Sequence, residues 1–165
     1  MESLSDELAI RLMDEAIEIA KSNPRAPFGC ILFDVSLNQT VARGVNNSKE
    51  NPLLHGEIVA INSYAETGHD RWSDLALITT AEPCCMCQGA ILWSGIEQVV
   101  YGSSIATLKQ QGWRQIDIAS ARLAQLSWRM DLGIRQGILE AECDALFREA
   151  MQVKDSQDRT NSERK

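Results

Sequence analysis

The chain has 165 residues, a formal net charge of -7 and 44% hydrophobic residues, which is typical of a single globular domain. It contains no run of the ~18 apolar residues that a membrane helix requires, and it is too apolar for disorder throughout. Its first residues include Glu2, Asp6 and Glu7 in place of a signal peptide's basic region, so we expect a cytoplasmic protein. An acidic chain is also a poor generic binder of nucleic acids, whose affinity depends on lysine and arginine.

Hydrophobic periodicity and turn residues predict alternating helices and strands. In chain order these are a helix (6–21), two strands (29–33, 40–44), a helix (54–67), a strand (75–79), a helix (83–94), a strand (98–101) and a helix (140–153). The first two strands form a predicted hairpin, whereas residues 103–131 have no clear pattern. Such alternation indicates one α/β domain over residues 1–153, followed by a flexible polar tail over 154–165.

The cysteine content argues for metal binding or catalysis. There are five cysteines, an odd number, and three of them lie nearly together at positions 84, 85 and 87. Without an export signal, a disulfide framework is not expected, because the thiols of a cytoplasmic protein stay reduced.

Two short segments carry the expected chemistry, and each opens a predicted helix. They are H-G-E at 55–57 and P-C-C-M-C at 83–87. Cys84 and Cys87 are three residues apart, so they share one face of a helix and can both reach one metal ion. With His55 they form a ligand set that zinc accepts, and three protein ligands leave one position for water, as in catalytic zinc sites.

Glu57 lies two residues after His55 and can face the same site from the first turn of its helix. A carboxylate beside zinc-bound water can take its proton and pass it to a leaving group. A C-x-x-C pair also occurs in redox sites and structural zinc sites. A structural zinc site would need a second C-x-x-C pair, which the sequence does not contain. A redox pair would stand without an accompanying H-x-E motif, which this sequence does contain. Helical spacing favours Cys84 with Cys87, and Cys85 then points elsewhere.

The combination of H-x-E with P-C-x-x-C resembles the cytidine/deoxycytidylate deaminase superfamily, and the resemblance extends over residues 8–151. It implies a three-layer α-β-α sandwich with a mixed central sheet, one Zn²⁺ per chain and a homodimer. It also implies hydrolytic deamination of a nucleobase or nucleoside. In that reaction Glu57 would move protons, the backbone N–H of Cys84 would stabilise the oxyanion, and Asn46 would bind the base.

Three substrates are consistent with this resemblance. Phe28 and Trp93 match bacterial guanine deaminases, in which aromatic residues wall a flat purine, although both would equally suit core positions. Overall length and the region 140–143 resemble bacterial tRNA adenosine deaminases, but the segment that follows is nearly neutral in charge. Gly56 within H-G-E is similar to fungal cytosine deaminases. We therefore expect a small-molecule substrate, guanine or a related purine, and a place in purine metabolism.

Residues 112–117 (G-W-R-Q-I-D) depart from all three groups. They fall where the family builds its specificity loop, so Arg114 or Asp117 could contact the substrate. A solvated loop anchored by Trp113 is the alternative. A zinc-stabilised scaffold that has lost turnover is a further hypothesis, but the presence of Glu57 argues against it, because a structural zinc site has no use for a proton carrier.

Overall fold

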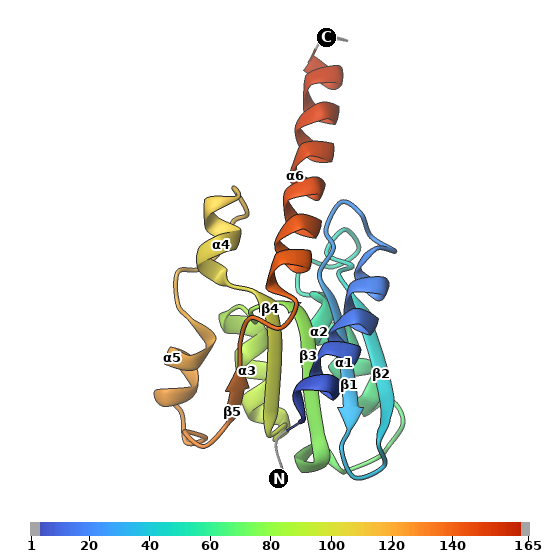
Figure 1. Ribbon diagram of the computed structural model, residues 1–165, viewed down its shortest axis with the longest axis vertical. Helices are drawn as coiled ribbons and strands as arrows, with labels where there is room; N and C mark the ends of the chain where they lie inside the picture. The colour runs from blue at the N-terminus through green and yellow to red at the C-terminus, as the bar shows by residue number, and fades with distance from the viewer. Residues whose placement is uncertain (1–3, 163–165) are drawn as a thin grey trace.

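The computed structural model describes residues 4–162, and the side chains of residues 4–154, as a central sheet with helices on both faces (Figure 1). The strands are β1 (Gly29–Asp34), β2 (Gln39–Val45), β3 (Leu75–Ala81), β4 (Gln98–Ser103) and β5 (Gly133–Arg135). The helices are α1 (Asp6–Ala20), α2 (Gly56–Ala65), α3 (Cys85–Ser94), α4 (Ile105–Gln110), α5 (Ser120–Gln125) and α6 (Glu140–Ser162), with a short 3-10 turn at Trp72–Asp74.

The sheet is mixed and has the strand order β2-β1-β3-β4-β5. β1 pairs antiparallel with both β2 and β3, whereas β3, β4 and β5 run parallel to one another. The carboxyl ends of β3 and β4 therefore meet at one edge of the sheet, and ligands of α/β proteins bind outside such edges. This arrangement confirms the predicted α/β class.

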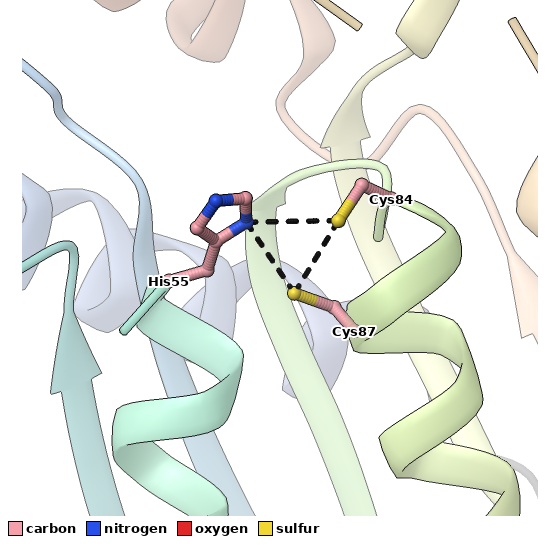
Figure 2. A group of neighbouring side chains, drawn as sticks. All are labelled: His55, Cys84 and Cys87. Carbon is pink, nitrogen blue, oxygen red and sulfur yellow. Dashed lines mark hydrogen bonds between the residues drawn. The ribbon is translucent and has the colours of Figure 1, made fainter. Parts of the chain in front are cut away.

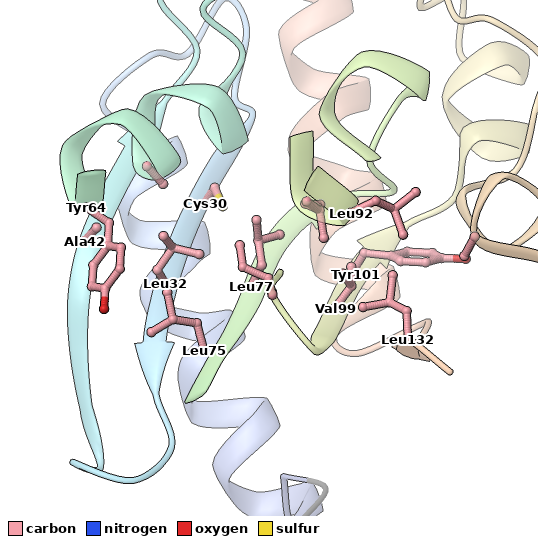
Figure 3. Packing of buried hydrophobic residues seen from close by; sticks show 14 residues of the cluster. Cys30, Leu32, Ala42, Tyr64, Leu75, Leu77, Leu92, Val99, Tyr101 and Leu132 are labelled. Atoms are coloured by element: carbon pink, nitrogen blue, oxygen red, sulfur yellow. The ribbon is translucent and has the colours of Figure 1, made fainter. Parts of the chain in front are cut away.

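Alternating side chains of the buried strands form two hydrophobic cores. On one face, Ile31 and Ile78 pack with α1 and with Cys143 of α6. On the other, Leu32 and Leu77 pack with α2 and α3 (Figure 3). Period-2 alternation directs neighbouring residues to opposite faces, so strands buried on both sides need a helix layer on each. The three-layer α-β-α sandwich is confirmed.

Most predicted elements are present within one or two residues, and the differences concentrate after β4. Residues 103–131, which have no clear pattern in sequence, contain the six-residue helices α4 and α5. Helix α6 continues to Ser162, where the sequence predicts a tail from residue 154, and it extends well beyond the sheet (Figure 1). Residues 163–165 of that predicted tail lie outside the described residues. None of the helices in the described chain has the length and apolar character needed to cross a membrane.

Candidate active site

The predicted ligands lie at the starts of two neighbouring helices. His55 is the N-cap residue of α2. Cys84 is the N-cap residue of α3, and Cys87 lies in the first turn of that helix. Both caps have extended backbone conformations, which turn the chain from a preceding loop into the helix. Figure 2 shows the three side chains converging from α2 and α3.

Their donor atoms form a nearly equilateral triangle. His55 Nδ1 lies 3.6 Å from the Sγ atom of Cys84 and 3.6 Å from that of Cys87, and the two sulfurs are 3.6 Å apart. Tetrahedral zinc with ordinary Zn–S and Zn–N bonds places its ligand atoms about 3.6–3.8 Å apart. The triangle therefore fits zinc without rearrangement, and all three donors come from the residues that the sequence predicts.

Glu57 lies beside this triangle and is almost completely buried, with 3% of its surface exposed. Its Oε1 accepts a hydrogen bond from Thr79 Oγ1 of β3 at 3.2 Å, and its Oε2 lies 3.4 Å from Cys87 Sγ. Burial is the largest influence on this group and raises the pKa of the Glu57 carboxyl. A carboxyl group with a raised pKa holds its proton more firmly, which suits a group that takes up and passes on protons.

The thiols differ in their electrostatic surroundings. Hydrogen bonding from Cys87, followed by that from His55, lowers the pKa of Cys84 to about 4. Cys87 has its pKa raised, chiefly by the same hydrogen bond and by burial. The hydrogen bond with Cys84 also raises the pKa of His55. The lowered pKa favours the thiolate form of Cys84, which is the form that binds metals.

Two glycines allow α2 to approach the sheet closely. A Cβ atom at Gly44 of β2 would lie 2.1 Å from the carbonyl oxygen of Gly56 and 2.5 Å from the nitrogen of Ala60. A Cβ atom at Gly56 would lie 2.4 Å from the carbonyl oxygen of Phe28. Glycine within H-G-E therefore has a packing explanation here, because any side chain would push His55 and Glu57 away from the sheet.

A cavity of about 610 Å³ opens above the triangle. Its lining residues come from loops, from the starts of α2 and α3, from the region after β4 and from α6, and they are Ala26, Phe28, Asn46, Ser48, Pro52, His55, Glu57, Glu82, Cys84, Met86, Gly112, Trp113, Arg114, Gln115, Ile116, Met151 and Lys154. This volume lies within the range of small-molecule sites, which is about 300–1,000 Å³.

The structure brings two of the three predicted substrate contacts to this cavity. Phe28 and Asn46 line it, and the Oδ1 atom of Asn46 accepts hydrogen bonds from the nitrogen and Oγ of Ser48 at 3.1 and 2.8 Å. Trp93 is not among the lining residues. It lies on the outer side of α3, 79% exposed, with its ring centroid 4.5 Å from that of Trp128. Because helix geometry turns Trp93 away from the cysteines, we withdraw it as a substrate contact.

Trp113, rather than Trp93, is the tryptophan that lines the cavity beside Phe28. It is 8% exposed, its ring meets that of Phe28 edge-on with centroids 5.1 Å apart, and its Nε1 donates to the carbonyl oxygen of Phe147 at 3.2 Å. Of the two predicted substrate contacts in the loop 112–117, Arg114 lines the cavity, whereas Asp117 is not among the lining residues and forms an ion pair with Lys109.

Sequence reasoning missed the cavity-lining residues Glu82, Met151 and Lys154. Met151 and Lys154 lie on α6, and the Lys154 Nζ atom lies 3.6 Å from the centroid of the Trp113 ring. No local pattern links residue 154 to residue 113. Glu82 directly precedes the Pro83–Cys84 pair, and its position beside the motif was the one available signal.

Comparison with known proteins identifies the site. Residues 6–103 match the family model for the cytidine and deoxycytidylate deaminase zinc-binding region. The chain belongs to this deaminase family. Zinc is the family's metal, and His55, Cys84 and Cys87 form the donor cluster that suits it.

Relatives of this deaminase carry several substrate names. A tRNA-specific adenosine deaminase of Streptococcus pyogenes serotype M1 is 34% identical over 137 residues, covering 79% of this chain and 76% of the relative. A probable cytosine deaminase of Schizosaccharomyces pombe is 36% identical over 93 residues, covering 54% of this chain and 57% of the relative. These relatives agree on the deaminase family, but their names differ in the base that is deaminated.

Solved structures share the fold of the deaminase. Guanine deaminase from Nitrosomonas europaea has a TM-score of 0.71 and 24% identity, covering 84% of this chain and 81% of its own. A structure from work on tRNA:A34 deaminases has a TM-score of 0.63 and 24% identity, covering 82% and 98%. A mutant of NE0047 in complex with 8-azaguanine has a TM-score of 0.75 and 25% identity, covering 86% of this chain and 83% of its own.

Proposed function

We propose that this deaminase hydrolyses the exocyclic amine of a free nucleobase or small nucleoside, with guanine or a related purine as the favoured substrate. One observation carries the proposal. Glu57 is buried beside a triangle of zinc donors at a cavity walled by aromatic rings. A scaffold protein would need the metal donors but would gain nothing from a buried carboxylate beside them.

The proposed reaction adds water to the ring carbon that bears the amine and releases ammonia, leaving a carbonyl group. His55, Cys84 and Cys87 would hold zinc, which supplies the Lewis acidity that allows water to react near neutral pH. Glu57 would take a proton from the attacking water, deliver it to a ring nitrogen and then carry a second proton to the departing ammonia. The backbone N–H of Cys84, which precedes the first turn of α3, would stabilise the developing oxyanion.

Recognition of a flat base is supported by the cavity walls. Phe28 and Trp113 present aromatic surfaces, and stacking contributes about 1–3 kcal/mol per base. The hydrogen bonds from Ser48 engage Asn46 Oδ1, and within the described part of the chain Asn46 Nδ2 has no such bond. We propose that Nδ2 donates to an acceptor on the base. The 8-azaguanine bound to NE0047 is a purine analogue, which supports a purine here.

The proposal is tested by ammonia release from guanine, guanosine, cytosine, adenine and a tRNA anticodon stem. We expect release from guanine or guanosine. Glu57→Gln should keep one zinc per chain, measured by elemental analysis, and lower kcat by at least ~10³-fold. The matched control is Glu66→Gln, at the exposed far end of α2. Stoichiometric zinc without ammonia from any substrate would support the scaffold hypothesis instead.

Deamination of tRNA adenosine is the second candidate. The Streptococcus pyogenes relative supports it, as do the cationic side chains of Arg114 and Lys154 at the cavity. The net charge of -7 argues against it, because RNA binding needs many phosphate contacts. Ammonia from the anticodon stem alone would establish this candidate and refute the free-base proposal. Release from cytosine alone would favour the activity in the Schizosaccharomyces pombe relative's name.

We further propose that the enzyme is a cytoplasmic homodimer. Its reduced thiols suit a reducing compartment, and no disulfide joins the five cysteines. Trp93 and Trp128 are 79% and 60% exposed, and their rings are in tilted contact with each other, as expected of an interface patch. Light scattering should show twice the chain mass for the wild type and for Leu37→Ser, a control at an exposed turn, but a single chain for Trp93→Ser. A monomeric wild type would refute the dimer.

A further inference from the structure

Glu82 joins two helix starts that are distant in sequence. It follows β3 directly and is 6% exposed. Its Oε2 accepts a hydrogen bond from the backbone nitrogen of Ile105 at 2.8 Å. Its Oε1 accepts from the nitrogen of Ser120 at 2.8 Å and from Ser120 Oγ at 3.0 Å. One carboxylate therefore holds the first residue of α4 and the first residue of α5.

The two helices differ in their need for this carboxylate. α4 has its own cap, because Ser104 Oγ accepts a hydrogen bond from the nitrogen of Thr107. The N-cap residue of α5 is Ala119, whose side chain has no acceptor, so Glu82 takes over this function from 38 residues away. Each helix has only six residues, and helices this short are not stable without tertiary contacts.

The segment between these two attachment points forms a wall of the active-site cavity. Gly112, Trp113, Arg114, Gln115 and Ile116 all line the cavity. Trp113 attaches the middle of the segment to α6 through its hydrogen bond to Phe147. Glu82 attaches both ends of the same stretch of chain, since α4 begins before it and α5 begins after it.

We infer that Glu82 is a positioning residue that sets substrate affinity and base preference by holding this wall in place. The inference rests on the proposed function. Glu82 itself is poorly placed to carry protons, because both of its oxygens already accept hydrogen bonds from N–H groups. Glu57, by contrast, has Oε2 directed at the ligand Cys87. The two carboxylates of the cavity thus have different functions.

The test is Glu82→Gln in the full-length zinc enzyme. An amide offers one acceptor oxygen where the carboxylate offers two, so one helix start loses its partner. We expect unchanged zinc content, kcat within about twofold of wild type, and KM for the preferred base raised about tenfold. The ratio of kcat/KM between purine and cytosine should fall by a similar factor.

Two measurements report on the wall without requiring turnover. Hydrogen exchange at the amides of Ile105 and Ser120 should become faster, and trypsin should cleave after Arg114 more rapidly. Ser104→Ala is the matched control, because it weakens the cap of α4 but leaves all three hydrogen bonds of Glu82 intact. It should leave KM and cleavage after Arg114 at wild-type values. If Glu82→Gln fails to fold, Ser120→Ala removes one of the three hydrogen bonds and should raise KM about threefold.

Two results would overturn the inference. Loss of zinc from Glu82→Gln would mean that the residue supports the metal ligands. Wild-type KM and base preference, together with faster exchange, would mean that the contacts serve stability alone. A wild-type enzyme that releases no ammonia from any substrate would refute the proposed function. In that case, unchanged exchange at Ile105 and Ser120 would separately refute the attachment by Glu82.

Discussion

Phe147 offers a quantitative test of how α6 supports the cavity. Its side chain is completely buried, and its ring centroid lies 4.7 Å from that of Phe28 and 5.7 Å from that of Trp113. Phe147→Leu keeps a large apolar side chain but removes both ring pairs, each worth about 0.5–1.5 kcal/mol. The free energy of unfolding should therefore fall by about 1–3 kcal/mol through these contacts. The hydrogen bond from Trp113 remains, because its acceptor is a backbone carbonyl.

Urea unfolding at fixed zinc concentration measures the loss of stability, and steady-state kinetics report on the wall. KM for the preferred base should rise about threefold with kcat unchanged, because Phe28 and Trp113 lose a shared support. The control is Phe33→Leu, at a site that is 2% exposed in the core against α1. It should lower stability and leave KM unaltered. Equal KM values in the two variants, or no loss of stability in Phe147→Leu, would refute the reasoning.

Three further predictions concern packing and pH. Gly44→Ala should cost at least ~2 kcal/mol of stability and lower zinc content, because its Cβ would meet backbone atoms of α2; normal zinc content would contradict this. Gln88→Met should raise the free energy of unfolding by about 1 kcal/mol, because both amide atoms of this buried side chain have no hydrogen-bond partner within the described residues. A urea midpoint below that of the wild type would contradict this prediction. Burial raises the pKa of Tyr101 to about 12 from an unfolded value near 10, so the unfolded chain loses this proton first and stability falls between pH 10 and 12. In Tyr101→Phe the free energy of unfolding should fall by about 2–3 kcal/mol less than in the wild type over this pH range. Parallel profiles of unfolding free energy against pH for the two proteins would refute the prediction.

The chemistry of the site could be predicted because its pattern is local. Cys84 and Cys87 are close in sequence and lie at one helix start, so their spacing alone brings the thiols together. His55 and Glu57 stand in the same relation to α2. The buried strands could be predicted equally well, because short apolar runs that are bounded by turn residues are too short for helices and are typical of buried strands.

The position of Trp93 could not be predicted from its residue type. It lies six residues after Cys87, and at about 100° per residue the two side chains are separated by roughly 120° around the helix axis. An aromatic residue in the same helix as the ligands therefore faces outward, while Trp113 from a segment without clear periodicity becomes the wall. Whether a tryptophan of α3 faces the cavity or the outside depends on how α3 packs on the sheet.

The sequence by itself determined the metal donors, the carboxylate beside them and the α/β class, because the donors and the carboxylate lie in two short motifs and the class follows from the alternation of helices and strands. The tertiary structure alone decided what surrounds the substrate. Residues 28, 113 and 154 meet at the cavity, and Glu82 reaches Ser120, only because the ends of parallel strands and α6 converge there. The net charge of -7 is a property of the whole chain, and it does not predict that Arg114 and Lys154 lie at the cavity. Contacts across such distances leave no periodic signal along the chain.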